Sequence, residues 1–150
     1  MMMKRELDAT DNAILEALKA DSRLSVRRLS ETVHRSPTAV FERLRRLEDD
    51  GIIRGYTVKI DDEKLGRGFT VFCNVKLRRI NAGIHETFAR EMALMEEVTE
   101  CYNVSGNYDY MLKVTVPDMQ AYRAFITERL GNLDILETVT SVFVMSTVKN

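Results

Sequence analysis

The sequence predicts an α+β protein in which a helical N-terminal part precedes a part that mixes strands and helices. Two observations carry this prediction. Apolar residues recur every three or four positions over about the first 50 residues, as on one face of an amphipathic helix. From residue 69 onward the spacing falls to two, which is typical of a half-buried strand. Residues 61–68 combine charged residues with two glycines, so they are the expected linker between the two parts.

Three short helices are expected in the first part, because three helix-start signals occur there. Asp8 and Asp11 have the spacing of a capping box, and the first helix should run from about residue 8 to residue 20. Ser25 is expected to cap a second helix. Ser36, followed by a proline at the first helical position, is expected to cap a third.

The third helix should end at Gly51, where a glycine suits the left-handed conformation that often closes a helix. Three short helices with tight connections predict a helix-turn-helix bundle. Residues 52–60 are rich in β-branched and aromatic side chains, so they are expected to add one or two strands as a wing. Residues 1–60 are therefore interpreted as one winged helix-turn-helix domain.

Residues 69–150 are interpreted as a second domain, because their elements alternate in the order strand, helix, strand, strand, helix, strand. This order is typical of a ferredoxin-like βαββαβ domain, a four-stranded antiparallel sheet with both helices on one face. After a first strand at 69–78, the expected elements are a helix with Ile84, Phe88, Met92 and Met95 on one face, strands at 98–105 and 110–116, a helix opening at Pro117 and Asp118 and carrying Met119, Tyr122, Ile126 and Leu130, and a strand at 139–148.

The sheet face away from those helices is expected to carry apolar side chains such as Phe72 and Phe143. An apolar second face on a small sheet predicts a partner. We expect self-association through the C-terminal domain.

The charge is unevenly distributed along the chain. The net charge is -1, but residues 1–60 carry +2 and residues 61–150 carry -3. Four arginines, Arg35, Arg43, Arg45 and Arg46, lie in one short stretch of the first part. Such clustering on one face would suit a nucleic acid.

Other classes of protein and site are not expected. Cys73 and Cys101 lack the spacing of a zinc site and are expected to be two buried thiols, while His34 and His85 are too far apart in sequence to suggest a metal site. We therefore expect no metal, no cofactor and no catalytic residue. The sequence has no run of eighteen apolar residues, and its first residues become acidic before any leader-like segment develops, so no membrane association and a cytoplasmic location are expected.

The third helix has one face suited to a DNA groove. Val40, Leu44 and Leu47 point one way and define the expected buried face. On the opposite side an arginine could meet guanine or phosphate, an aromatic ring could meet a thymine methyl, and a glutamate could accept from cytosine. The free amides at the helix start could hold a phosphate. The residues expected to contact double-stranded DNA are Ser36, Thr38, Ala39, Phe41, Glu42, Arg45 and Arg46, with Arg54 as a backbone contact.

A plainer alternative is that these charges form a solvated helix face with pairs four residues apart. Glu42 with Arg46 and Arg45 with Asp49 have that spacing. Arg43 lies nearer the buried edge and could be structural.

The order and spacing of several motifs resemble the Lrp/AsnC family of transcriptional regulators over nearly the whole chain. The matching stretches are Leu7 to Asp11 with Ile14 and Leu15, Asp21 to Ser25, Ser36 to Thr38 with Glu42 to Glu48, Gly51 to Ile53 with Gly55 and Tyr56, and Val104 to Tyr110. The resemblance implies a DNA-binding, effector-sensing regulator that forms dimers through its C-terminal domain and, in many members, octamers.

The resemblance also implies a small-molecule effector, an amino acid or a related metabolite, bound near a Gly-x-x-Asp loop. Here that loop is Gly106–Asp109, in which a carboxylate such as Asp109 could accept from an α-ammonium group. A plain hairpin turn, with Asn107 and Asp109 present for turn chemistry, is the alternative. The residues expected to contact the effector are Asn103, Gly106, Asn107, Tyr108, Asp109, Met119, Thr140, Ser141 and Val142.

Two other functions are compatible with this sequence. One is an effector-independent protein that bends or wraps DNA as an oligomer. The other is an enzyme similar to siroheme decarboxylases, which share this fold, although their sites depend on histidine and arginine and only His85 lies in the second part of this chain.

Overall fold

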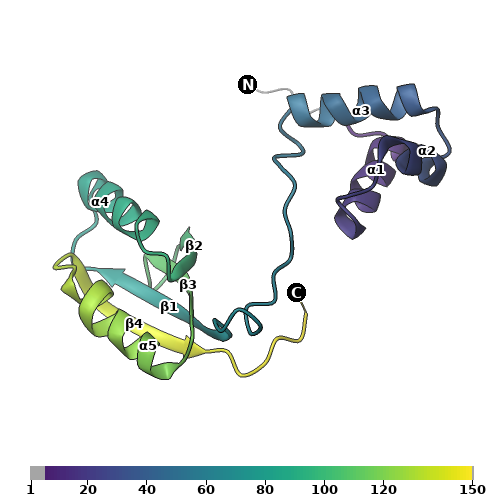
Figure 1. Cartoon of the computed structure of the whole chain (residues 1–150). Helices are drawn as coiled ribbons and strands as arrows, with labels where there is room; N and C mark the ends of the chain where they lie inside the picture. The colour runs from purple at the N-terminus through teal and green to yellow at the C-terminus, as the bar shows by residue number, and fades with distance from the viewer. Residues whose placement is uncertain (1–5, 150) are drawn as a thin grey trace. The chain divides into compact units, whose positions relative to one another are not determined.

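The computed structural model describes residues 6–149 and divides into two compact units, with the boundary between Lys59 and Ile60 (Figure 1). Residues 1–5 and residue 150 lie outside the described residues. The leader-like start considered above and the outer ends of the two expected domains therefore lie there too. Each unit is described separately below.

The first unit contains three helices, α1 (Ala9–Ala20), α2 (Val26–Val33) and α3 (Pro37–Asp49) (Figure 1). All three predicted N-caps are confirmed. Asp8 and Asp11 form a reciprocal capping box, and the side chains of Ser25 and Ser36 accept backbone N–H groups from the first turns of α2 and α3. Gly51 follows α3 with φ +68°, the left-handed conformation expected there.

A small apolar core holds the three helices together. It consists of Ile14 and Leu18 from α1, Leu29 from α2, and Val40 and Leu47 from α3, all buried. Leu44 packs against this cluster. The predicted buried face of α3 is therefore confirmed, and its opposite face lies in solvent.

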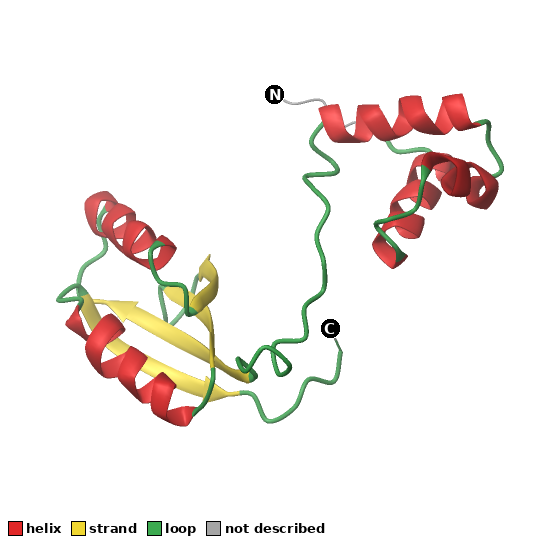
Figure 2. Ribbon diagram, viewed as in Figure 1, coloured by secondary structure: helices red, strands yellow, loops and turns green. Residues whose placement is uncertain are grey.

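The prediction of wing strands at residues 52–60 is wrong for this chain, since none of these residues is in a strand and the segment is drawn as loop throughout (Figure 2). A strand needs a neighbour to receive its backbone hydrogen bonds. Within the described residues the segment is held by isolated contacts instead, such as the Tyr56 hydroxyl to Glu48 Oε1 at 2.7 Å. Together with Leu15 and Leu18 of α1 it lines an open groove of about 820 Å³.

The second unit has the predicted ferredoxin-like topology. Its elements are β1 (Phe69–Leu77), α4 (Ala82–Ala93), β2 (Val98–Asn103), β3 (Tyr110–Val116), α5 (Met119–Ala124) and β4 (Leu136–Phe143). The sheet order is β2-β3-β1-β4, and every pair of neighbouring strands is antiparallel (Figure 1).

Several boundaries differ from the predicted ones. The last strand ends at Phe143 rather than Val148, since its ladder with β1 stops at the pair Val71 and Phe143; beyond that pair, Val144 N–H donates to Thr70 O at 3.2 Å. The second strand ends at Asn103 rather than at residue 105, where the turn begins. After α5 the chain continues as a π-helical turn at Phe125–Arg129 and a 3-10 turn at Leu130–Asn132, so the predicted helix is real but irregular.

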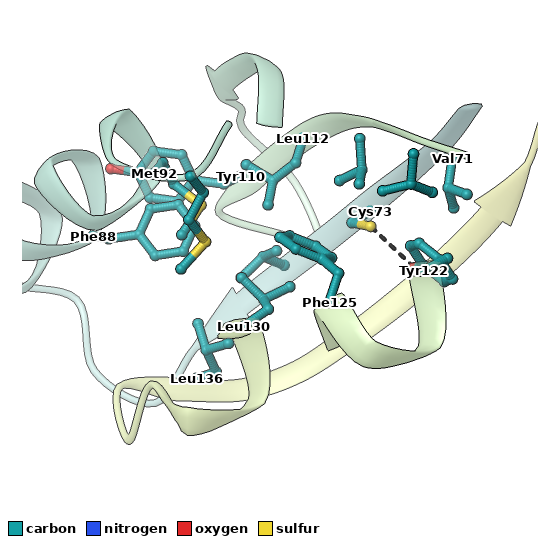
Figure 3. Packing of buried hydrophobic residues seen from close by; sticks show 14 of the residues in the cluster. Val71, Cys73, Phe88, Met92, Tyr110, Leu112, Tyr122, Phe125, Leu130 and Leu136 are labelled. Atoms are coloured by element: carbon teal, nitrogen blue, oxygen red, sulfur yellow. Dashed lines mark hydrogen bonds between the residues drawn. The ribbon is translucent and has the colours of Figure 1, made fainter. Parts of the chain in front are cut away.

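The core of the second unit lies between the sheet and its two helices (Figure 3). Alternate β1 residues point into it, and Phe88 of α4 stacks near Tyr110 with ring centroids 4.4 Å apart. Cys73 is buried as predicted, with Sγ 3.2 Å from the Tyr122 hydroxyl (Figure 3). Burial raises the pKa of this thiol, so it behaves as a small apolar side chain.

Two residue placements predicted from sequence are wrong. Phe143 pairs with Val71 and packs on the helix side, with its ring 5.5 Å from that of Tyr122. Its register opposite Val71, a buried core residue, places Phe143 on that side of the sheet. Cys101 is exposed rather than buried, because it lies on β2, which pairs with β3 at the edge of the sheet in the described structure.

The opposite side of the sheet is not covered by either helix. We call it the outer sheet face. By strand register it carries Phe72, Asn74 and Lys76 of β1, Met111 and Lys113 of β3, Thr138, Thr140 and Val142 of β4, and Glu100 and Tyr102 of β2. Phe72 lies there as predicted.

Within residues 6–149, no helix combines the length and the apolar character needed to span a bilayer.

Candidate functional site

The outward side of α3 presents the side chains expected to contact DNA. Phe41 is 54% exposed although it is aromatic, and none of the described residues of the first unit, from residue 6 onward, covers it. Ala39 is half-buried at the edge of the helix. The remaining members of the set are exposed: Ser36, Thr38, Glu42, Arg45, Arg46 and Arg54.

The ion pairs of the plainer interpretation are also present on this face. Arg45 lies 3.8 Å from Asp49, and Arg46 lies 3.8 Å from Glu42. Both pairs are long and solvent-exposed, so each stabilises the helix little. A phosphate or a base edge could therefore displace either carboxylate.

Arg43 has a different role from its neighbours. Its Nη1 lies 2.6 Å from Asp8 Oδ2 and 2.7 Å from Asp11 Oδ1, and the Asp11 side chain is only 3% exposed. The Asp11 backbone N–H and then the Arg43 guanidinium lower the pKa of Asp8. Arg43 thus fastens α3 to the start of α1, the structural role that its angular position allowed.

The Gly106–Asp109 loop joins β2 to β3 in the second unit. We call it the effector loop. Gly106 is exposed and has φ +121°, which disfavours any side chain at this position. In the described part of the chain, the backbone N–H groups of residues 106–108 donate no hydrogen bond. They are free to meet an anionic group.

Asp109 is the fixed end of this loop, and it is 8% exposed. Its carboxylate accepts from the Leu77 backbone N–H at 2.8 Å and from Lys76 Nζ at 3.2 Å. Its own N–H donates to Val75 O at 2.9 Å. The Leu77 N–H first, and then Lys76, lower the pKa of Asp109 despite its burial. Both carboxylate oxygens accept a hydrogen bond from within the chain, so Asp109 fixes the loop, and its contact with an effector stays a prediction.

The other expected effector residues fall into two groups. Near the loop, Asn103 Nδ2 donates to Asp109 O at 2.9 Å, and the Tyr108 hydroxyl lies 3.4 Å from Thr140 Oγ1. Ser141 instead faces the helix side and hydrogen-bonds the Tyr122 hydroxyl, because it pairs with Cys73.

Met119 and Val142 also differ in their surroundings. Met119 begins α5, which belongs to the helix side, and it is 52% exposed. Val142 lies on the outer sheet face beside Phe72 and is 49% exposed. The structure therefore gathers Asn103, Tyr108, Asp109 and Thr140, whereas Met119 and Ser141 belong to the other side of the sheet.

Three residues next to the effector loop escaped sequence reasoning. Lys76 pairs with Asp109, 33 positions later in the chain. His85 Nδ1 lies 2.7 Å from the Tyr110 hydroxyl, a contact between residues 25 positions apart in the chain. These partners are brought together by strand register and helix packing, and no local spacing signals them.

Across residues 6–149, His, Cys, Asp and Glu side chains form no group that could hold a metal ion.

Two family profiles together cover most of the chain. A winged helix-turn-helix DNA-binding domain matches residues 7–54, and the Lrp/AsnC ligand binding domain matches residues 70–150. The leucine-responsive regulatory protein of Escherichia coli strain K12 is 40% identical over 145 residues, which cover 97% of this chain and 88% of that protein.

Solved structures agree with this assignment. A transcriptional regulator from Neisseria meningitidis, solved in complex with L-Met, is 33% identical, with a TM-score of 0.92 and coverage of 97% of this chain and 94% of that one. An AsnC family transcriptional regulator from Agrobacterium tumefaciens is also 33% identical, with a TM-score of 0.90 and coverage of 96% and 94%. These likenesses set aside the decarboxylase alternative: the protein is a ligand-responsive DNA-binding transcriptional regulator, not an enzyme, and it belongs to the Lrp/AsnC family.

Proposed function

We propose that this regulator places α3 in the major groove of its operator and responds to an amino acid bound at the effector loop. The observation that supports it best is the contrast between Arg43 and its two neighbours. Arg43 is held by Asp8 and Asp11, whereas Arg45 and Arg46 have only long, exposed ion pairs. A rigid helix thus presents two readily available cations.

On the DNA side, each group of residues has a chemical role. Arg45 and Arg46 bind guanine edges or phosphates, and Phe41 with Ala39 lies against thymine methyls. Ser36 and Thr38, at the helix start, bind a phosphate, and Arg54 adds a backbone contact. Glu42 accepts from a cytosine amino group once Arg46 has turned to the DNA.

On the effector side, the free backbone N–H groups of residues 106–108 receive the α-carboxylate of the amino acid. An apolar amino acid such as leucine or methionine is the proposed effector. The relative named as leucine-responsive and the neighbour solved with L-Met support this choice. Asp109 holds the loop in place, and Asn103, Tyr108 and Thr140 border it. The ligand is proposed to bind where copies of the chain meet, which would bring Met119, Ser141 and Val142 of the original set to it.

Assembly is proposed to begin with a dimer formed through the outer sheet face. Phe72, Tyr102 at 51% exposure and Val142 at 49% give this face its apolar character, while Lys113 and Glu100 pair across it at 2.9 Å. Octamers would be built from such dimers. Because the regulator is proposed to bind chromosomal DNA, we assign it to the cytoplasm.

The direct test selects bound DNA from a random pool with the purified full chain, then titrates the selected duplex with and without each amino acid. We expect one apolar amino acid to change the DNA affinity or the assembly state and to raise the melting temperature by mass action. Gly106→Val should remove that response but keep DNA binding, because a side chain is strained at φ +121°. DNA binding that no amino acid alters, together with an unmoved melting temperature, would instead favour the architectural function.

A further inference from the structure

The surroundings of His85 point to a residue that the proposed function does not yet use. His85 lies in the first turn of α4 and is half-buried against the sheet. Its Nδ1 is 2.7 Å from the Tyr110 hydroxyl, and the two ring centroids are 5.6 Å apart. Tyr110 is the first residue of β3 and directly follows Asp109 in the chain.

Tyr110 packs with its ring against an apolar residue, Phe88, and with its hydroxyl against a polar one, His85. Its ring is 6% exposed and lies against Phe88, while its hydroxyl meets only the His85 ring among the side chains described. Because Tyr110 directly follows Asp109, the contacts that hold the Tyr110 side chain also limit where the Asp109 backbone can lie. Asp109 is in turn held by Val75, Leu77 and Lys76.

We propose that His85 is a positioning residue for the effector loop, which it holds through Tyr110, and that its charge state is linked to effector binding. The second part rests on the proposed function. When neutral, the imidazole can accept the Tyr110 hydroxyl proton at Nδ1, whereas the imidazolium can only donate there, so protonation reverses this hydrogen bond.

The groups that face this cluster come from each neighbouring strand. Asp109 contributes a negative charge, Lys76 of β1 a positive one, and Cys101 of β2 lies near enough to affect Tyr110. His85 lowers the pKa of Asp109 after Leu77 and Lys76, so the histidine and the loop carboxylate interact electrostatically. An imidazolium at His85 would therefore stabilise the ionised Asp109 carboxylate, as Lys76 does. By linkage, a ligand that shifts the loop must shift the protonation of His85.

The chain provides its own reference for measuring this. It has two histidines, and His34 closes α2 in the other unit, far from the effector loop in sequence. NMR of the full chain can follow both imidazoles between about pH 5 and pH 8, where histidine commonly titrates. The backbone amides of Lys76, Leu77 and residues 106–109 are recorded in the same series, and His34→Asn assigns the two ring signals.

In the effector-free protein, we expect the loop amides to shift with the midpoint of His85 and not with that of His34. A through-space field alone could produce part of this shift, so the decisive variant is Tyr110→Phe, which keeps the ring and removes the hydroxyl. Most of the amide response should disappear in Tyr110→Phe and persist in Tyr56→Phe, which removes a hydroxyl from the first unit. Loop amides that stay flat through the His85 titration, or an equal response in Tyr110→Phe, would overturn the proposal.

The ligand arm separates this inference from the proposed function. L-methionine and L-leucine are added to the same samples, and calorimetry measures their affinity across the same pH range. We expect the affinity to change through the His85 midpoint, and to become flat in His85→Asn. If neither compound binds but the amides follow His85, the positioning role stands and the amino-acid assignment fails. Binding that is independent of pH, alongside flat amides, overturns the role of His85 and leaves the proposed function intact.

Discussion

At the scale of single residues, Asp109 makes the clearest stability prediction. Its folded pKa is lowered chiefly by the Leu77 N–H, so its ionised form stabilises the fold above the pKa of an unfolded aspartate, near 4. That stabilisation is lost as the pH falls through the lowered folded pKa. Asp109→Asn should cost about 1.5–3 kcal/mol at neutral pH, the usual value of hydrogen bonds to a charged group.

Urea unfolding of both proteins at a series of pH values measures this cost. The difference between them should shrink steadily below about pH 4, where the wild-type carboxyl also becomes neutral. Asp134→Asn, a change at an exposed aspartate, is the matched control and should leave the free energy of unfolding unchanged at neutral pH. A wild-type advantage that persisted at low pH would mean that packing, not charge, holds this position.

Arg43 makes a second prediction at this scale. Arg43→Ala removes the guanidinium from Asp11, which is only 3% exposed, so it should destabilise the first unit by about 2 kcal/mol. Arg45→Ala, two positions along the same helix, should change stability by less than about 0.5 kcal/mol, because Arg45 is exposed. Thermal unfolding followed by circular dichroism compares the two variants. Equal losses would show that Arg43 is not the anchor of α3.

At this scale, a contact could be predicted from the sequence only when its two residues lie close together in the chain. The Asp8 and Asp11 capping box is local, so its spacing was sufficient to predict it. The contacts of Arg43 with Asp8 and of Lys76 with Asp109 span 35 and 33 positions, and only the fold brings them together. The same holds for His85 and Tyr110. The internal donors to Asp109 could therefore not be predicted from the sequence.

At the scale of elements, α3 makes the prediction that bears on DNA. The double change Arg45→Ala and Arg46→Ala should lower the affinity for selected duplex by at least about tenfold at fixed salt, with an intact assembly. If both residues bind phosphates, the slope of log affinity against log salt should fall by about 2. Fluorescence anisotropy over a salt series measures both quantities.

The matched control removes two exposed arginines from the second unit, Arg90 of α4 and Arg123 of α5. This variant has the same net charge as the α3 variant but an unaltered recognition helix. An equal loss in both proteins would mean that only overall charge matters, and would remove α3 from the proposed interface.

Elements were predictable where local chemistry decides them. The three N-caps and the alternation of β1 held in the structure, because side-chain capping and burial act over a few residues. The ends of the strands and the wing could not be predicted in the same way, because they depend on pairing with residues far away in the chain. Residues 52–60 have strand-like composition but no neighbouring strand in the described chain, and the pairing of β4 with β1 stops at Phe143 and Val71.

At the scale of the whole molecule, the outer sheet face makes a prediction about assembly. Phe72 lies on this face between Lys113 and Val142, so Phe72→Glu would bury a charge in the proposed dimer. Light scattering coupled to size exclusion should show the mass falling toward the 17.2 kDa of one chain. Gln120→Glu, on exposed α5, adds the same charge elsewhere and should leave the mass unchanged. A multimeric Phe72→Glu protein would place the interface on another surface.

Fold class was within reach of the sequence because it depends on periodicity and element order, which survive small errors in boundaries. The composition of the interface was only partly predictable: Phe72 lies on the outer sheet face, but Phe143 faces the helix side because the strand register pairs it with Val71.

Residues 54–58 have backbone N–H groups that are unpaired in the described chain, so the hydrogen exchange of this segment can be used to detect binding. Their five backbone N–H groups donate to no acceptor in the described chain, so in a lone molecule they should take up deuterium at nearly the rate of an unfolded peptide. A strand, a second chain or a DNA backbone laid along them would slow that uptake at consecutive positions. The rate of deuterium uptake at residues 54–58 would therefore report, without any label or mutation, when a strand, a second chain or DNA lies beside this segment.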